Sequence, residues 1–171
     1  MIWLGVDPGA SGGYAMWSAD DMRLVYARAF KDRSPVEVVN DIIAAVCGLH
    51  GPFAGAVVEK NNTGTPQMGR TSVATFSHQT GWNVGMLDTL SVTHALRWME
   101  VRAADWQRAL HIPATNFKLG DSQRKKVLTQ FLQRRHPEVR CTVKLTDAVL
   151  IASAAALLWT NEQRGRSVST G

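Results

Sequence analysis

Cysteine is scarce in this sequence, and long hydrophobic runs are absent from it. Only Cys47 and Cys141 occur among the 171 residues, and neither belongs to a CxxC pair or a Cys/His ligand pattern. This argues against a disulfide scaffold and a structural zinc site, and it favours a reducing compartment. The longest apolar run, residues 148–159, stops well short of the ~20 residues that a membrane helix needs. No basic segment precedes the first apolar residues, so a signal peptide is not expected. We therefore expect a soluble, cytoplasmic protein that does not contact membranes.

Repeats and low-complexity segments are also missing. The chain is 45% hydrophobic and 19% charged, a balance that excludes general disorder and supports a buried core. Its length suits one domain and leaves little room for a second. We predict a single domain over residues 1–163, followed by a flexible tail over 164–171.

Positive charge is concentrated in one part of the chain. The net charge is +5, and residues 97–140 hold ten Lys/Arg against four Asp/Glu. This segment is either a solvated helix face or a surface that binds phosphates, because phosphate binding requires clustered Lys and Arg. Charge by itself does not decide between the two.

Hydrophobic periodicity and turn residues predict an α/β fold. Short apolar runs separated by Gly and Asp turns predict a three-stranded antiparallel meander. Ser34 and Pro35 are typical of a helix start, as N-cap and first helical residue. The expected strands are 2–6, 14–17, 23–30, 53–58 and 98–101. Three helices are expected over about 71–90, 103–110 and 145–159, and two more are expected to begin near 35 and 121. A meander joined to a strand–helix–strand unit implies a mixed five-stranded sheet flanked by helices.

Three acidic residues stand beside apolar segments. Asp7 ends the first predicted strand, Glu59 ends the fourth, and Asp147 lies in the first turn of an almost wholly apolar helix. Each has an ordinary explanation. Asp7 suits the Asp-Pro-Gly turn, Glu59 suits a strand-end surface charge, and Asp147 suits the positive end of the helix dipole.

Taken together, the three carboxylates predict a metal site. The first and fourth strands are plausible neighbours, and the last helix can pack across their ends. Converging carboxylates disfavour ionisation without a cation, and oxygen ligands without His or Cys select Mg²⁺ or Mn²⁺. Two such ions can activate a water and stabilise the leaving oxygen at a phosphodiester. With a basic segment available for nucleic acid, these residues indicate a metal-dependent nuclease.

The same segments resemble the motifs of a known family. GVDPGASGGYA at 5–15 resembles the first-strand motif of the RuvC-type Holliday junction resolvases, within the RNase H-like superfamily. VVEK at 57–60 resembles their second acidic motif, and LTDAVLIA at 145–152 resembles their last one. The polar stretch after 59 and the segment 101–106 are most similar to phage-encoded members. The resemblance covers about residues 2–159.

This resemblance implies an RNase H-like fold and a homodimer that resolves four-way DNA junctions by two symmetrical nicks. It implies two Mg²⁺ ions per site, with Mn²⁺ able to substitute. Asp7 would bridge both ions, Glu59 would bind one, and Asp147 the other. The protein would act in the cytoplasm of a bacterium, or of its host if phage-encoded. We expect the dimer interface on the helix predicted over 71–90.

One family ligand is replaced in this sequence. The family usually has an acidic or histidine ligand three or four residues before the last Asp, where this chain has Lys144 and Val143. Either a water or substrate oxygen completes the metal shell, or Lys144 acts as a cationic substitute at the phosphate.

The resemblance also implies basic residues near the scissile phosphate. Arg102 takes one such place, and the sequence leaves Lys118, Arg124 and Lys125 open for a second. Phe76 is a candidate wedge between unstacked bases, although a core position explains it equally well. The remaining residues expected at the DNA are Lys60, Arg70 and Lys126, and each basic residue could instead be an ordinary surface charge.

Three other functions compete with a junction resolvase. A nuclease of broader specificity would also cut forks, flaps and three-way junctions. A catalytically inactive module would bind junctions without cutting them. An actin-like sugar kinase or ATPase shares an Asp followed by glycines, but this chain is too short for the two lobes of such enzymes.

Overall fold

The computed structural model describes residues 1–8, 12–30, 33–48, 53–60, 81, 85–92, 95–113 and 121–168. It contains a five-stranded sheet with the strand order β3-β2-β1-β4-β5. The strands are β1 (Ile2–Asp7), β2 (Gly13–Ser18), β3 (Arg23–Ala29), β4 (Phe53–Glu59) and β5 (Trp98–Val101). The first three form an antiparallel meander, whereas β4 runs parallel to β1 and β5 runs parallel to β4. The predicted mixed sheet of five strands is confirmed.

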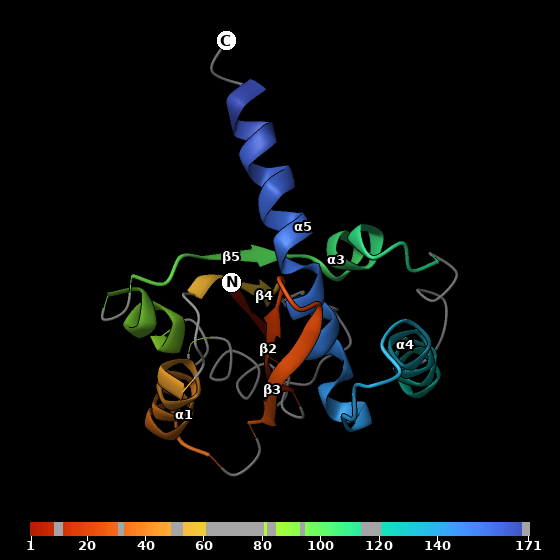
Figure 1. Ribbon diagram of the computed structural model, residues 1–171, viewed down its shortest axis with the longest axis horizontal. Coiled ribbons are helices and arrows are strands. Elements are labelled where there is room, and N and C mark those ends of the chain that lie inside the picture. Colours follow the sequence, from red (N-terminus) through yellow and green to blue (C-terminus); the bar gives the residue numbers. More distant parts are fainter. Residues whose placement is uncertain are drawn as a thin grey trace, which may run out of the picture.

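Helices flank this sheet (Figure 1). They are α1 (Pro35–Gly48), α3 (Ala103–Ala109), α4 (Asp121–Arg135) and α5 (Thr146–Val168), and a short 3-10 turn, η2 (Val143–Leu145), precedes α5. Residues 85–92 are also helical. The start of α1 is a capping box, because the Glu37 amide donates to Ser34 Oγ and the Ser34 amide donates to the Glu37 carboxylate.

Alternate strand residues build a separate core on each face of the sheet. Trp3 and Val57 face a core shared with α3, α4 and α5. Leu4 and Val58, one residue further along, face a second core shared with α1 and the helical residues 85–92. Because β1 is central and covered on both faces, all six of its residues are buried.

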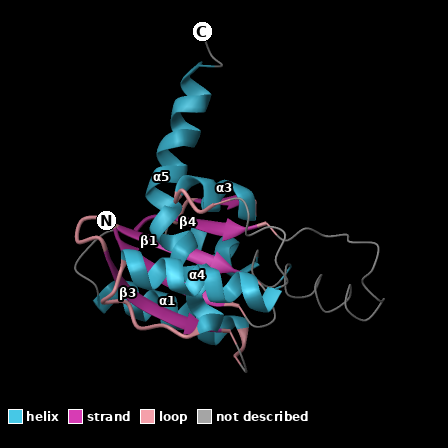
Figure 2. Ribbon diagram, turned by 90° about the vertical axis from the view of Figure 1, so that its right-hand side faces the viewer, coloured by secondary structure: helices cyan, strands magenta, loops and turns pink. Residues whose placement is uncertain are grey.

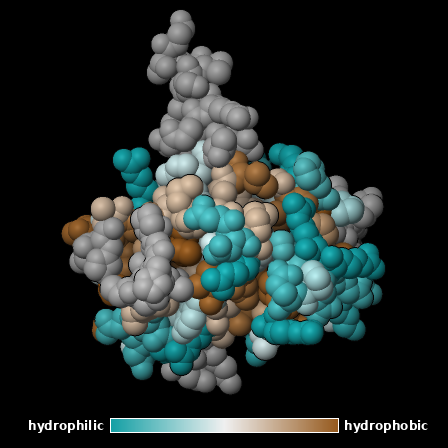
Figure 3. Space-filling view, in the orientation of Figure 1, coloured by the Kyte–Doolittle hydropathy of each residue, from teal (hydrophilic) through white to brown (hydrophobic). Residues whose placement is uncertain are grey.

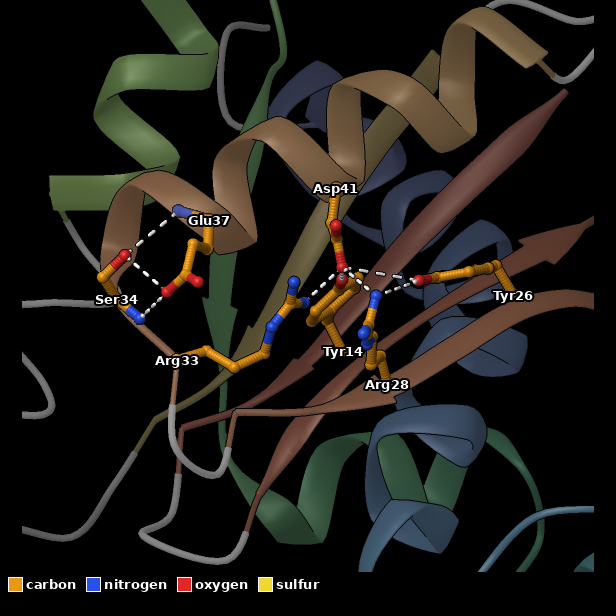
Figure 4. Close-up of polar contacts among 7 residues, drawn as sticks. All are labelled: Tyr14, Tyr26, Arg28, Arg33, Ser34, Glu37 and Asp41. Atoms are coloured by element: carbon orange, nitrogen blue, oxygen red, sulfur yellow. Dashed lines mark hydrogen bonds and ion pairs between the residues drawn. The ribbon is translucent and has the colours of Figure 1, made fainter.

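A polar cluster on the α1 face ties that helix to the meander (Figure 4). One carboxylate oxygen of Asp41 accepts hydrogen bonds from the Tyr14 hydroxyl at 3.1 Å and from Arg28 Nη1 at 2.6 Å, and Arg33 Nη1 donates to the same oxygen. The hydrogen bond from Arg33 is the main reason that the pKa of Asp41 falls from 3.8 to about 2. The cluster therefore holds an ionised carboxylate between α1, β2 and the end of β3.

One helix is longer than the sequence predicts, and another is described only in part. α5 continues past 159 to Val168, through part of the segment expected to be a tail, and it projects beyond the sheet (Figure 2). Of the helix predicted over 71–90, only residues 81 and 85–90 are described, and those are helical. Met86, Leu87 and Leu90 are buried against the chain's own sheet.

Among the described residues, no helix has both the length and the apolar character of a membrane span.

Candidate active site

Asp7 and Glu59 lie at the same edge of the sheet, where β1 and β4 end. β1 and β4 are parallel neighbours, and their register pairs Val6 with Val58. The residues that follow this pair are Asp7 and Glu59, the last residues of the two strands. Asp7 is only 9% exposed because its strand is central. The prediction that the first and fourth strands are neighbours is confirmed.

α5 brings Asp147 toward this edge through a close contact with β1. A Cβ added at Gly5 would lie 2.3 Å from the Ala152 nitrogen and 2.5 Å from the Ala148 oxygen, both backbone atoms of α5. Only glycine permits such a backbone approach between strand and helix. Asp147 directly precedes Ala148 and is 3% exposed. The Gly5 contact therefore determines where Asp147 lies relative to the end of β1.

The three carboxylates share one electrostatic environment, centred on Glu59. Burial raises the pKa of Glu59 from 4.5 to about 7, and the charges of Asp7 and Asp147 raise it further, whereas the Trp106 hydrogen bond and the charge of Arg124 lower it. Removing a carboxylate from water disfavours its charged form, and neighbouring negative charges do the same. A Glu in this environment is partly protonated at neutral pH.

The indole of Trp106 contacts Glu59 directly. Nε1 of Trp106 donates a hydrogen bond to Oε2 of Glu59 at 2.7 Å, across 47 positions of sequence. α3 begins just after Arg102, and β5 pairs Val101 with Glu59, so the chain enters α3 beside the carboxylate. Trp106 itself is completely buried.

Two cations of α4 face Asp147. Arg124 Nη2 lies 3.4 Å and Lys125 Nζ 4.0 Å from Oδ2 of Asp147. Both cations are largely buried, at 21% and 24% exposure, so their attraction to the carboxylate is less screened than at an open surface. The hydrophilic area on the right of Figure 3 lies where Figure 1 places α4.

The donor set of this edge fits a hard divalent cation. Asp7, Glu59 and Asp147 supply carboxylate oxygens alone, which Mg²⁺ and Mn²⁺ prefer. As the side chains lie, no three His, Cys, Asp or Glu residues of the described part are grouped closely enough to hold an ion. The charges of Asp7 and Asp147 nevertheless reach Glu59, since both raise its pKa.

The other basic residues predicted at the DNA are placed differently. Arg102 is exposed and forms two hydrogen bonds with Asp105, at 2.9 and 3.2 Å. Lys60 lies 3.9 Å from Glu100. Lys126 and Lys144 are exposed on α4 and η2. The remaining predicted residues, Arg70, Phe76 and Lys118, lie outside the described residues.

Comparison with known structures gives the fold its name. A solved structure of Thermus thermophilus RuvC in complex with a Holliday junction substrate matches at a TM-score of 0.59 and 17% identity, covering 95% of this chain and 96% of that one. The fold is that of RuvC. Another Thermus thermophilus RuvC structure matches at the same TM-score and 16% identity, covering 95% and 97% of the two chains. No family model and no curated protein sequence matches this chain.

The RuvC fold confirms the resemblance seen in the motifs and the predicted RNase H-like architecture. The greater similarity of this sequence to phage-encoded members stays a prediction. The sequence analysis identifies neither the hydrogen bond of Trp106 to Glu59 nor the contact of Gly5 with α5. The only sequence signal for Trp106 was its place in the segment after β5 that resembles phage members. Gly5 lies inside the first motif, where its small size was a usable signal.

Proposed function

We propose that this protein is a divalent-metal-dependent endodeoxyribonuclease that resolves four-way DNA junctions by two symmetrical nicks. The observation that carries the proposal is the environment of Glu59 in a RuvC fold, where burial and the charges of Asp7 and Asp147 raise its pKa to about 7. That Thermus thermophilus RuvC is solved with a Holliday junction substrate supports branched DNA as the substrate.

Each carboxylate has a defined part in this proposal. Asp7 and Asp147, both buried, would hold Mg²⁺ or Mn²⁺ together with Glu59, two ions in each site. When bound, such ions activate a water and stabilise the leaving oxygen of a phosphodiester. Glu59 would lose its proton as a cation binds, since positive charge favours the ionised carboxylate. Arg124 and Lys125 would then be freed from Asp147 to face the DNA phosphates.

The proposed enzyme is a homodimer. Two coordinated nicks across a symmetric junction require two active sites related by a two-fold axis. The buried Met86 and Leu87 belong to the chain's own core, so the part of the 71–90 helix that is described does not offer them to a partner. Sedimentation at micromolar concentration, with and without a junction, should show a dimer.

Cleavage of branched DNA tests the proposal. A labelled mobile four-way junction should be cut into nicked duplexes in Mg²⁺ and left intact in EDTA, beside a matched linear duplex that is not cut. Asp7→Asn should abolish cutting while junction binding persists, because it removes a metal-binding charge and keeps the side chain's shape. Asp20→Asn, in the exposed turn after β2 at the opposite end of the sheet from Asp7, is the control and should cut as wild type does.

The same experiment decides between the alternatives. Equal cutting of forks, flaps and four-way junctions would indicate the broader branched-DNA nuclease. Junction binding in EDTA with no nick in Mg²⁺ or Mn²⁺ would indicate an inactive binding module, which the loss of a ligand at Lys144 favours. Cutting by Asp7→Asn at the wild-type rate would overturn the metal-site assignment.

A further inference from the structure

Trp106 occupies a position that packing alone does not explain. Its ring is completely buried in the core shared by α3 and α5, and packing in such a core needs no polar atom. Its one polar atom, Nε1, nevertheless donates to Oε2 of Glu59 at 2.7 Å. A hydrogen bond to a carboxylate is shorter and stronger than one between neutral groups.

A second tryptophan of the same core shows that an indole here does not need a partner. Trp3, on β1, is 5% exposed and belongs to the same buried cluster. Its Nε1 is buried and makes no hydrogen bond in the described structure. The core therefore accepts an unpaired indole N–H at Trp3, while the N–H of Trp106 is aimed at a carboxylate of the candidate site.

The hydrogen bond restricts how Glu59 can move. Glu59 is the last residue of β4, and a glutamate side chain at a strand end has three rotatable bonds. With Oε2 held by the indole, the carboxylate stays at the edge where Asp7 and Asp147 act on it. Residues that form hydrogen bonds to a metal-binding side chain commonly influence the affinity of the site for its metal.

We propose that Trp106 is a positioning residue for metal binding: its indole N–H holds Glu59 in the orientation from which the carboxylate binds a divalent cation. This inference rests on the proposed metal site. It concerns the affinity for metal before DNA binds, so it can be measured without cleavage.

Titration calorimetry of the full chain with MnCl₂, without DNA and at about pH 8, tests the inference. Trp106→Phe keeps an aromatic ring and removes the N–H, and we expect Mn²⁺ affinity to fall by about 10-fold or more. Trp3→Phe makes the same reduction in size and removes an unpaired N–H, so its affinity should stay within about twofold of wild type. In a Glu59→Gln background, Trp106→Phe should cause no further loss.

The outcomes separate the inference from the proposed function. If Trp106→Phe binds Mn²⁺ as tightly as wild type, or if both Phe variants lose affinity equally, Trp106 only packs in the core. Either result would leave the proposed metal site unaffected. No Mn²⁺ binding by the wild-type protein would overturn the metal site and this inference together.

A measurement on the unsubstituted protein covers the case in which Trp106→Phe does not fold. The chain has six tryptophans, and each indole N–H gives its own nitrogen–proton NMR signal. Mg²⁺ should shift the signal of Trp106, whose partner binds the ion, and leave that of Trp3 in place. An unmoved Trp106 signal at saturating Mg²⁺ would contradict the inference.

Discussion

Glu59 lies in an environment that opposes its own charge. Burial and the charges of Asp7 and Asp147 raise its pKa from 4.5 to about 7, whereas the Trp106 hydrogen bond and the charge of Arg124 act in the other direction. In the metal-free folded protein, Glu59 therefore keeps its proton at pH values at which the unfolded chain has already lost it. The residue is less stable as an anion in the folded protein, and a bound cation would reverse that preference.

The stability of the metal-free protein should therefore depend on pH through Glu59. Between about pH 4.5 and 7 the folded state binds more protons at this site than the unfolded state, so the free energy of unfolding should fall as pH rises. Glu59→Gln removes this contribution. In EDTA the variant should match wild type near pH 4.5 and exceed it above pH 7, by up to about 3 kcal/mol. Urea denaturation across this range checks it, and parallel curves for the two proteins would contradict it.

Lys144 lies three residues before Asp147, where the RuvC-type motif that this segment resembles usually has an acidic or histidine ligand. It is exposed on η2, two residues before α5 begins. If it clamps a phosphate, Lys144→Ala should lower the cleavage rate through lost electrostatic stabilisation, with little change in the Mg²⁺ requirement. If it merely replaces a ligand, Lys144→Asp should lower the Mg²⁺ concentration needed for half-maximal rate. We expect the first result. A Mg²⁺ titration of both variants decides, and wild-type behaviour of both would remove Lys144 from the site.

At the scale of elements, the site depends on how α5 lies across β1. The helix touches the strand where Gly5 leaves room for its backbone, and Asp147 is in the turn of α5 next to that contact. Trp106 reaches Glu59 because α3 begins beside the end of β4, and Arg124 reaches Asp147 from α4. Three helices and two strands thus contribute to this edge, and a shift in any of them would move a functional group.

Gly5→Ala should disrupt this arrangement. The new methyl would lie within 2.7 Å of three backbone atoms of α5, which cannot move aside as a flexible side chain can. We expect the free energy of unfolding to fall by about 1–3 kcal/mol or more, together with metal affinity. Gly85→Ala is the control. It lies in a helix with no atom of the described residues within 4 Å of the added methyl, and the change should be neutral or stabilising by about 0.5–1 kcal/mol. Equal urea midpoints for the two variants would contradict this account.

At the scale of the whole molecule, basic residues gather at the end of the sheet that carries the carboxylates. Arg124 and Lys125 of α4 face Asp147, and Lys126 is exposed on the same helix. Arg23 and Arg97 are also exposed but lie at the opposite end, beside the last residue of β2 and the start of β5. The chain thus allows charge near the site and charge far from it to be compared.

The salt dependence of junction binding should distinguish these two groups. Changing Arg124, Lys125 and Lys126 together to Gln should flatten the slope of log K against log salt by about 2–3, since each lost phosphate contact contributes about 0.9. The double change of Arg23 and Arg97 to Gln should leave the slope unchanged. Binding measured in EDTA avoids cleavage. An unchanged slope in the α4 variant would mean that the DNA surface lies elsewhere.

The sequence by itself determined the elements and the three acidic positions. Short apolar runs, Gly and Asp turns, and the Ser34-Pro35 helix start are local signals, and the structure has the predicted strands and the predicted starts of α1, α3, α4 and α5. Asp7, Glu59 and Asp147 were conspicuous because a carboxylate beside apolar residues is costly without compensation. Their assignment as metal ligands stays a prediction.

Only the tertiary structure decided what surrounds those carboxylates. The Trp106 hydrogen bond spans 47 positions and the Arg124 ion pair spans 23, so no local pattern announces either. A buried tryptophan looks the same in sequence whether its N–H is paired, as in Trp106, or unpaired, as in Trp3. The end of α5 was likewise not predicted, because no residue pattern in the sequence marks where this helix stops. Burial, and with it the raised pKa of Glu59, arises only when separate helices pack against one edge of the sheet, because desolvation depends on all the atoms around a group and not on its neighbours along the chain.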